Sequence, residues 1–259
     1  MEQAPEQITF EHPLNERTRT FLRFEHLFNL TGYHSQQETY WSSRAAIDGI
    51  VDMHNILLSR TDIKSEILKE LGRYKLYFLE LTNSSDVDQN LLSQTLKQIE
   101  DSTSDIQINV GQIGHALREN DFIQSILNRS GIPGGSCSFD LPLYHYWLEQ
   151  PANLRTAHLQ QWLNVVEPIR KSVKLLLSLM RDSSMPTDEV AERGLFQMSL
   201  NSKTPARLIR ISLPKDASIL PKVSGSRHKF SIRFLKIDTQ NRTAEISQDI
   251  QFKLTCCTI

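Results

Sequence analysis

The chain has 259 residues, of which 39% are hydrophobic and 23% are charged, and its formal net charge is −1. These values are typical of a globular protein with one large or two modest domains, and they argue against a disordered chain. The opening segment MEQAPEQITF is acidic and lacks the apolar stretch of a secretory signal peptide. The longest apolar run of the second half, at 173–180, is too short to span a bilayer. The sequence therefore predicts a soluble, cytoplasmic protein without a membrane-inserted segment.

Apolar residues follow a helical spacing from about residue 15 to residue 181. In the first predicted helix they recur at steps of three and four, and Asn15 is a suitable N-cap. Pro168 is expected to interrupt or kink the last helix. The further predicted helices cover 41–58, 63–81, 91–99, 122–127 and 153–181.

The apolar spacing changes to a period of two in the C-terminal part, after the polar segment SSMPTDEVAERG, which is predicted to be a connector. The predicted strands cover 195–200, 208–213, 230–235 and 244–254. The opening QITFEHP is strand-like as well and can pair with this sheet. We therefore expect an α+β fold with a mainly helical domain at 14–182. Residues 1–13 and 190–259 are expected to form a small antiparallel β domain of three or four strands.

The segment GIPGGSCSFDLPLYHYW, at 131–147, places a serine, a cysteine and a histidine around two glycines. A nucleophile elbow requires G-x-S-x-G after a strand, but here serine replaces the second glycine and a helix end precedes the motif. The alternative is a Pro-Gly-Gly turn followed by a helix that Asp140 caps, and this explains more of the residues. The turn is preferred, and the enzyme alternative is Ser136 or Cys137 with His145 as the base.

Metal and nucleotide sites have little support in the sequence. The three cysteines are Cys137 and the adjacent pair Cys256 and Cys257, which suits neither a disulfide framework nor a tetrahedral zinc site. Neither GxxxxGK[ST] nor GxGxxG follows a predicted strand. No cofactor and no metal are therefore expected.

Positive charge is concentrated in the C-terminal sheet. Between Lys203 and Lys236 there are nine Lys or Arg residues and a single acid, Asp216. In the segment SRHKFSIRF the cations Arg227, Lys229 and Arg233 alternate with apolar residues, so the cations are expected to share one face of a strand while the apolar side chains enter the core.

The first helix carries a second basic stripe, formed by Arg19, Arg23 and His26 at i, i+4 and i+7. One basic strand is often only a solvated face, but two such stripes favour a surface that binds an anion or an acidic peptide. A nucleic acid is the competing ligand. Phe230 and Phe234 argue against it, because they are expected to lie opposite the cations, in the core, where they cannot stack on bases.

Several sequence blocks occur in the order seen in one protein family. They are FEHPLNERTRTFLRFEHLF, LKEL at 68–71, LRE at 117–119, GIPGGSCSFDLPLYH and VSGSRHKFSIRF. With these blocks the chain resembles the ZapD family of FtsZ-associated cell division proteins over nearly its whole length. The stretches 31–44 and 183–206 are the least similar.

The resemblance implies a helical domain joined to a β domain, a symmetric homodimer and no catalysis. It also implies binding to the C-terminal tail of FtsZ, the tubulin-like GTPase of the division ring, and bundling of FtsZ protofilaments at midcell, with neither nucleic acid nor membrane insertion. Lys229 stands where arginine is usual, and Asp121 where the family can carry arginine. The residues expected to bind the tail are Arg23, Arg60, Arg118, His145, Arg227, Lys229 and Arg233.

Overall fold

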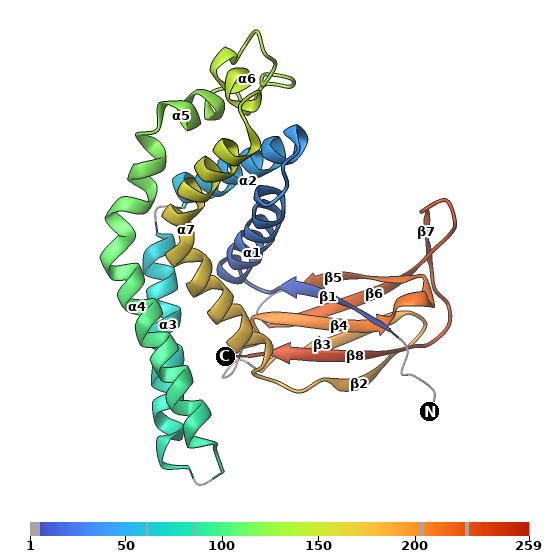
Figure 1. Cartoon of the computed structure of the whole chain (residues 1–259). Helices are drawn as coiled ribbons and strands as arrows, with labels where there is room; N and C mark the ends of the chain where they lie inside the picture. The colour runs from blue at the N-terminus through green and yellow to red at the C-terminus, as the bar shows by residue number, and fades with distance from the viewer. Residues whose placement is uncertain (1–5, 61, 85, 202–204, 226–227, 259) are drawn as a thin grey trace. The chain divides into compact units, whose positions relative to one another are not determined.

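The computed structural model describes residues 6–60, 62–84, 86–201, 205–225 and 228–258, and of residues 109–116 and 118 it describes the backbone only. These residues form seven α-helices and two 3-10 helices, together with eight strands that pair antiparallel (Figure 1). The seven α-helices precede all strands but the first, which confirms the predicted α+β class.

The chain folds as two compact units. One, the helical unit, spans Leu22–Leu176, and the other, the β unit, combines Met1–Phe21 with Leu177–Ile259. The predicted domain limits, 14–182 against 1–13 with 190–259, remain a proposal about which segments fold independently.

The helices largely follow the predicted ranges, and the side chain of Asn15 caps the first of them by accepting from the N–H of Thr18 at 2.8 Å. Pro168 lies inside α7, which continues through it, so the predicted interruption is absent, whereas the predicted kink stays a prediction. Asp140 does not cap α6, whose N-cap position is Leu141, so that prediction was also wrong. The helices are α1 (Glu16–Ser35), α2 (Tyr40–Ser59), α3 (Ile63–Glu80), η1 (Leu81–Asn83), α4 (Gln89–Arg118), α5 (Asp121–Leu127), α6 (Pro142–Leu148) and α7 (Ala152–Arg181).

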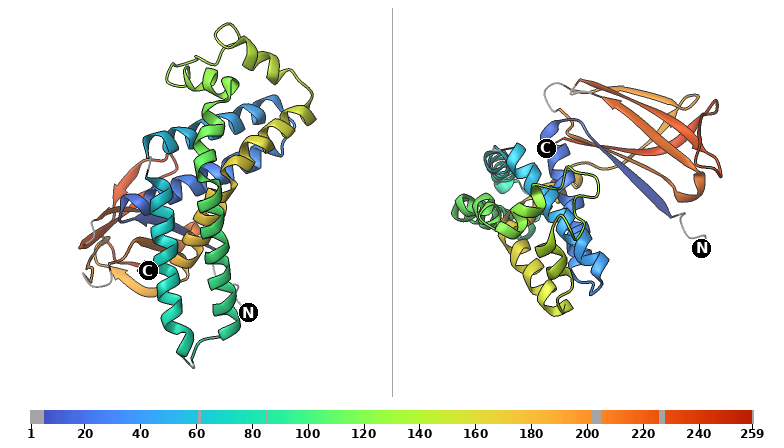
Figure 2. Two further views of the ribbon diagram at one scale, coloured as in Figure 1. Left: turned by 90° about the vertical axis from the view of Figure 1, so that its left-hand side faces the viewer. Right: turned by 90° about the horizontal axis from the view of Figure 1, so that it is seen from above.

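Within the helical unit, α3 and α4 run side by side as a long hairpin, which the left view of Figure 2 shows along its length. An ion pair between Lys75 and Glu100, 2.8 Å apart, bridges the two helices. α4 is much longer than the predicted 91–99, because the mainly polar segment after position 99 still contains apolar side chains that become buried. Ile106, for example, is fully buried.

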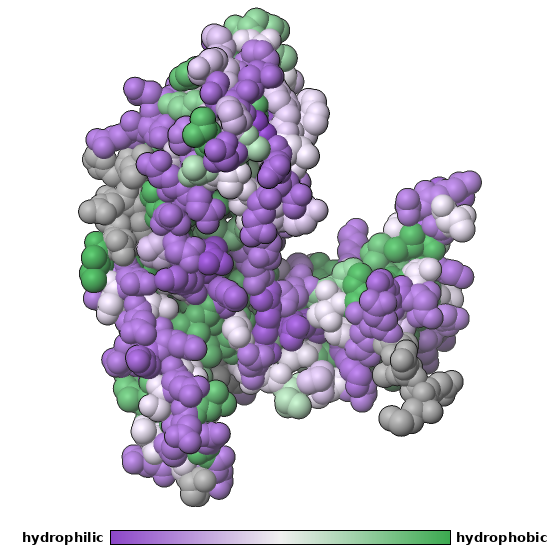
Figure 3. Space-filling view, in the orientation of Figure 1, coloured by the Kyte–Doolittle hydropathy of each residue, from purple (hydrophilic) through white to green (hydrophobic). Residues whose placement is uncertain are grey.

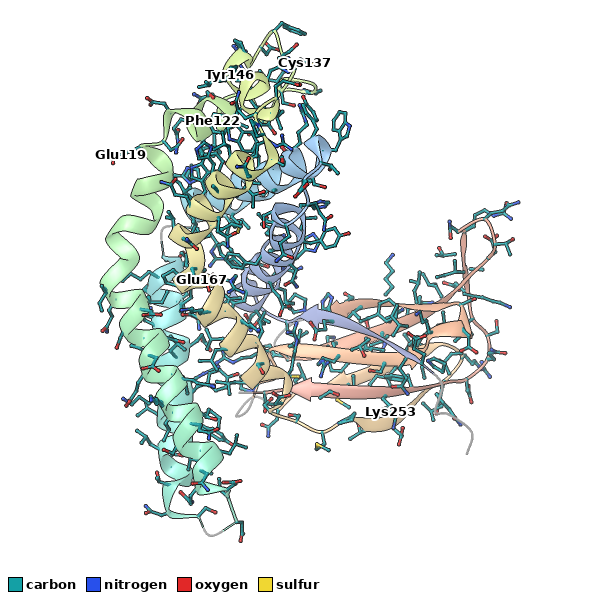
Figure 4. All side chains as sticks on the ribbon, in the orientation of Figure 1. Glu119, Phe122, Cys137, Tyr146, Glu167 and Lys253 are labelled. Atoms are coloured by element: carbon teal, nitrogen blue, oxygen red, sulfur yellow. The ribbon has the colours of Figure 1, made fainter. Side chains whose placement is uncertain are left out.

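An aromatic cluster joins α5, α6 and α7 at the other end of the helical unit. The ring of Phe122, labelled in Figure 4, lies 5.9 Å from Tyr144, 5.4 Å from Trp147 and 5.3 Å from Trp162. Rings at these separations add attraction to the area that they bury. The cluster therefore fixes the short helix α6, which has too few residues to be stable by itself.

The β unit contains two four-stranded sheets rather than the single small sheet that was expected. One sheet has the order β1-β4-β8-β2, and the other has the order β3-β6-β5 with β7 also paired to β6. The strands are β1 (Gln7–Pro13), β2 (Thr187–Ala191), β3 (Leu195–Ser199), β4 (Leu208–Pro214), β5 (Ile219–Gly225), β6 (Lys229–Ile237), β7 (Thr243–Glu245) and β8 (Ile250–Cys257), with the 3-10 helix η2 at Lys215–Ala217.

Three strand predictions need correction. β2 lies within the segment that was predicted to be a connector, and β5 was not predicted at all. The predicted strand at 244–254 is divided into β7 and β8, which belong to different sheets. By contrast, the prediction that QITFEHP forms a strand is confirmed, and this strand, β1, pairs with β4 along its whole length.

The two sheets pack around one apolar core that draws side chains from both. Phe252 of β8 lies 5.3 Å from Phe196 of β3 and 4.9 Å from Phe234 of β6, measured between ring centroids. The inner faces of the sheets are thus used for packing, and side chains at the alternate positions of each strand are left for the outer faces.

A charged cluster on the outer face of the first sheet fastens β1 to the rest of the β unit. Glu11 of β1 accepts two hydrogen bonds from Arg181 at the end of α7, both 2.8 Å long, and a third from Arg210 of β4 at 3.0 Å. The three side chains are only 19–32% exposed. One carboxylate therefore bridges two arginines and offsets the repulsion between them.

Candidate functional site

The cations of β6 lie on the outer face of its sheet. Lys229 and Arg233 are exposed, whereas Phe230, Ile232 and Phe234 are 2%, 0% and 0% exposed. This arrangement confirms the alternation that the sequence predicts. Because residues i and i+4 of a strand share a face, the two cations are about 13 Å apart along the strand.

The neighbouring strand adds a third cation to this face. Lys222 of β5 is the direct partner of Arg233 in the ladder, and directly opposed residues of an antiparallel pair point to the same side. Like charges in this position repel each other, so an anion is favoured between them. We refer to Lys222, Lys229 and Arg233 with the polar side chains between them as the cationic face.

A shallow hollow of about 560 Å³ lies on the cationic face beside Lys229. Its polar lining comes from three adjacent strands: Gln197 and Ser199 of β3, Ser224 of β5 and Ser231 of β6. Hydroxyl and amide groups can donate hydrogen bonds to, and accept them from, a peptide backbone. The hollow thus offers neutral polar contacts next to positive charge.

One carboxylate balances part of this charge. Glu245 of β7 forms an ion pair with Arg233, with 3.0 Å between Oε1 and Nη1. The turn that joins β6 to β7 is hydrophilic, as its purple colour in Figure 3 shows. The strand pairing places Glu245 opposite Leu235, two residues along β6 from Arg233 and on the same face.

The helices carry further candidate residues. Arg23 and His26 are exposed on α1, and His145 is exposed on α6, whereas Arg19 is half-buried and pairs with Glu16 at 3.1 Å. The basic stripe on α1 is therefore partly neutralised at its beginning. Its second half stays accessible to a ligand.

Arg60 has a structural partner that the sequence did not reveal. It ends α2, and its guanidinium lies 2.8 Å from the carboxylate of Glu66 and 3.7 Å from that of Asp62, both across the α2–α3 connection. The side chain is 25% exposed. A ligand carboxylate would have to share Arg60 with these acids.

For two further candidates the structure gives little or no description. Arg118 lies at the end of α4, but its side chain is outside the described residues, and so is Arg227 as a whole. Asp121, where the family can carry arginine, begins α5 directly after its N-cap Asn120. An acid suits this first turn, because it faces the positive end of the helix dipole.

The glycine-rich segment before α6 forms a succession of turns, as predicted. Gly134 takes the left-handed conformation, with φ of 72°. Arg44 donates hydrogen bonds to the side-chain and backbone oxygens of Ser136, and its guanidinium carbon lies 5.3 Å from the ring centroid of Tyr144. Since a guanidinium stays protonated, it anchors the turn and cannot activate Ser136 as a general base.

Cys137 follows in the same segment, is exposed, and is labelled in Figure 4 on the loop that precedes α6. The structure records no hydrogen bond between its thiol and His145. Changing Cys137 to alanine is expected to shift the free energy of unfolding, measured in urea, by less than about 0.5 kcal/mol, because the side chain is exposed. A larger loss would contradict this expectation.

The adjacent cysteines of β8 lie in different surroundings. Burial raises the pKa of the Cys257 thiol to about 11, and burial with the nearby Glu189 raises that of Cys256. Both thiols are therefore protonated at neutral pH and are poor nucleophiles and metal ligands.

In the described part of the chain, no three His, Cys, Asp or Glu side chains are grouped to hold a metal ion. None of the described helices is long and apolar enough to cross a membrane.

The sequence did not indicate three charged residues that form contacts in the fold. Arg44 and Arg155 are drawn into contacts inside the helical unit, and Glu245 pairs with Arg233 of the cationic face. Only Glu245 carried a local signal, since it lies in a short polar hairpin after the basic strand. The partners of all three residues depend on strand register or helix packing.

Comparison with known proteins bears on the role of this fold. A family model described as ZapD, cell division protein, matches residues 22–233. A protein of Methylococcus capsulatus named Cell division protein ZapD is 38% identical over 251 residues, which cover 97% of this chain and 98% of the relative. Proteins of the same name from Dechloromonas aromatica and Coxiella burnetii are 37% and 34% identical, with 97% of this chain covered in both cases and 100% and 98% of the relatives. The chain belongs to the ZapD family of cell division proteins.

Proposed function

We propose that this protein binds the C-terminal tail of FtsZ and cross-links FtsZ protofilaments at the division ring, without catalysing a reaction. Membership in a family of cell division proteins supports a role in division. The cationic face supports an acidic polypeptide as the ligand. The proposed location is the cytoplasm at midcell, where the tails of the polymer are displayed.

The observation that carries this proposal is the imbalance of charge on the cationic face. Lys222, Lys229 and Arg233 share it, and Glu245 forms an ion pair with only one of them, Arg233. Exposed charges of this kind attract a ligand weakly and lose strength as salt is added. A single contact of this type therefore suits a ligand that is presented in many copies.

Further contacts are proposed from each unit. Arg227, Lys229 and Arg233 belong to the β unit, and Arg23, Arg60, Arg118 and His145 to the helical unit. Among the helical residues, Arg23 and His145 are the best candidates, because both are exposed, whereas Arg60 is held by Glu66.

A homodimer would convert this weak contact into a cross-link. Two copies related by a two-fold axis present two equivalent tail sites, and protofilaments display many tails. Bivalent capture can raise the apparent affinity by about 10²- to 10⁴-fold over that of one site. The protein would then act on polymer and leave free FtsZ subunits nearly unbound.

A nucleic acid is a less suitable ligand for the cationic face. Non-specific binding of single strands usually combines cations with exposed aromatic rings on which bases stack. Phe230 and Phe234, the aromatic residues of β6, are 2% and 0% exposed and belong to the core between the sheets. The cationic face therefore supplies charge without stacking surfaces.

Co-sedimentation with FtsZ tests the proposal directly. The protein is mixed with polymerised full-length FtsZ or with FtsZ that lacks its C-terminal tail, and the pellets are compared at low and moderate salt. We expect bundles and co-pelleting with the full-length polymer only, and less of both as salt rises. Equal pelleting with the tail-less polymer would contradict the proposal.

A further inference from the structure

The ion pair between Arg233 and Glu245 lies on the surface and not in the core. The two side chains are 50% and 77% exposed, and the distance between Nη1 and Oε1 is 3.0 Å. Glu245 ends β7, a strand of three residues that pairs only with the end of β6. Such a pair contributes little to stability, because water solvates both partners when they separate.

The pair occupies the part of the cationic face where an anion is most favoured. Arg233 stands opposite Lys222 of β5, and Glu245 reaches Arg233 from β7, which pairs with the opposite edge of β6. A guanidinium binds a carboxylate through two parallel hydrogen bonds and is the strongest carboxylate ligand of this face. In the free chain one side of this fork is already occupied, by a carboxylate from the same chain.

We propose that Glu245 is an internal competitor that occupies the carboxylate subsite of Arg233 until an acidic residue of the bound peptide replaces it. This inference rests on the proposed function. It adds where one contact of the peptide lies, at Arg233, and which residue weakens that contact, Glu245. Binding exchanges one exposed ion pair for another, so the net gain at Arg233 is small. The remaining gain comes from Lys222 and Lys229, which the ligand reaches without displacing Glu245.

The geometry also specifies the ligand. Lys229 lies about 13 Å from Arg233 along β6, with the polar hollow beside it. An extended peptide advances about 3.3 Å per residue, so two of its acids four positions apart can reach both cations at once. The ligand is thus an extended acidic segment with polar or small residues between its acids.

The experiment measures binding of a fluorescently labelled FtsZ tail peptide to the full chain by anisotropy. Glu245→Gln removes the competing charge and keeps the size of the side chain, and it is expected to tighten binding about two- to fivefold at low salt. Asp188→Asn is the matched control. Asp188 forms an ion pair with Lys253 in the other sheet, also at 3.0 Å, and the substitution changes the net charge by the same amount. The control is expected to change the affinity by less than about 1.5-fold.

A double-mutant cycle separates competition from a general effect of charge. If Glu245 acts through Arg233, the gain from Glu245→Gln disappears when Arg233 is already glutamine. A gain of the same size in both backgrounds would overturn the inference, because it would show that Glu245 acts through the overall field. Unchanged binding by Glu245→Gln alone would also overturn it, and weaker binding would show instead that Glu245 orients Arg233.

The outcomes distinguish this inference from the proposed function. If neither the wild-type chain nor Glu245→Gln binds the tail peptide, the proposed function fails, and the inference fails with it. If the wild-type chain binds and Glu245→Gln gives no gain, only the competitor is excluded. Circular dichroism of each variant checks that the exposed substitutions leave the fold intact.

Discussion

Replacing Arg155 by methionine is expected to lower the free energy of unfolding by about 3 kcal/mol or more. Arg155 is 7% exposed, and its guanidinium joins α7 to α2, to α6 and to the connections that precede α2 and α7. It donates to the hydroxyl of Ser43 at 3.0 Å and to the backbone oxygen of Leu148 at 3.1 Å, and also to the backbone oxygens of Glu38 and Gln150. Methionine fills a similar volume but removes the donor from four acceptors, two of them buried and two partly buried.

Urea unfolding, followed by the fluorescence of Trp147 and Trp162, measures this loss. Arg170→Met on the same helix is the matched control, because Arg170 makes an i,i+3 ion pair with Glu167 and is 46% exposed. The control is expected to lose less than about 1 kcal/mol. Equal losses from the two variants would mean that the guanidinium of Arg155 contributes no more than an exposed one.

The second large effect is expected for tail binding. Arg233→Glu should weaken the binding of the FtsZ tail about tenfold or more and abolish bundling, because it places a second carboxylate beside Glu245 on the face that must attract an acid. The side chain of Arg233 is 50% exposed, so the fold should survive the change. Peptide anisotropy and co-sedimentation with FtsZ give the two readouts.

Lys253→Glu is the control for this charge reversal. Lys253, labelled in Figure 4, lies on β8 of the other sheet and is 42% exposed, and its reversal alters the net charge by the same amount. We expect it to bundle FtsZ nearly as well as the wild-type chain. Normal bundling by Arg233→Glu would exclude the cationic face as the tail site.

The sequence predicts the parts of the fold that depend on local patterning. Alternation in 230–235 places Phe230 and Phe234 in the core and Arg233 outside, because the side-chain period of a strand fixes which residues share a face. The N-cap at Asn15 is likewise a local hydrogen bond that the sequence shows. These predictions hold because they need no knowledge of which elements become neighbours.

Other elements exist only through their partners. β2 (Thr187–Ala191) is mostly polar, and only its ladder with β8 makes it a strand. β5 (Ile219–Gly225) contains Pro221, which weakens a strand pattern although it is tolerated at the edge of a sheet. The division of 244–254 into β7 and β8 depends on the pairing of two sheets, which no local signal encodes.

In the candidate site, too, the local pattern predicts some features and tertiary pairing decides the others. The outward direction of Lys229 and Arg233 follows from the period of the strand. By contrast, the ion pairs of Arg233 with Glu245 and of Arg60 with Glu66 depend on the paths of a hairpin turn and a helix connection. A sequence can therefore indicate which cations reach the surface, but it does not show which of them already have a partner.

The attachment of β1 through Glu11 has a consequence for biosynthesis. Glu11 and Arg210, which it binds, are 199 positions apart. At about 5–20 residues per second, a ribosome needs about 10 to 40 seconds to make the intervening chain. During this time the backbone edge of QITFEHP has no strand to join, so a nascent chain that stalls before β4 exposes a segment that chaperones must shield from aggregation.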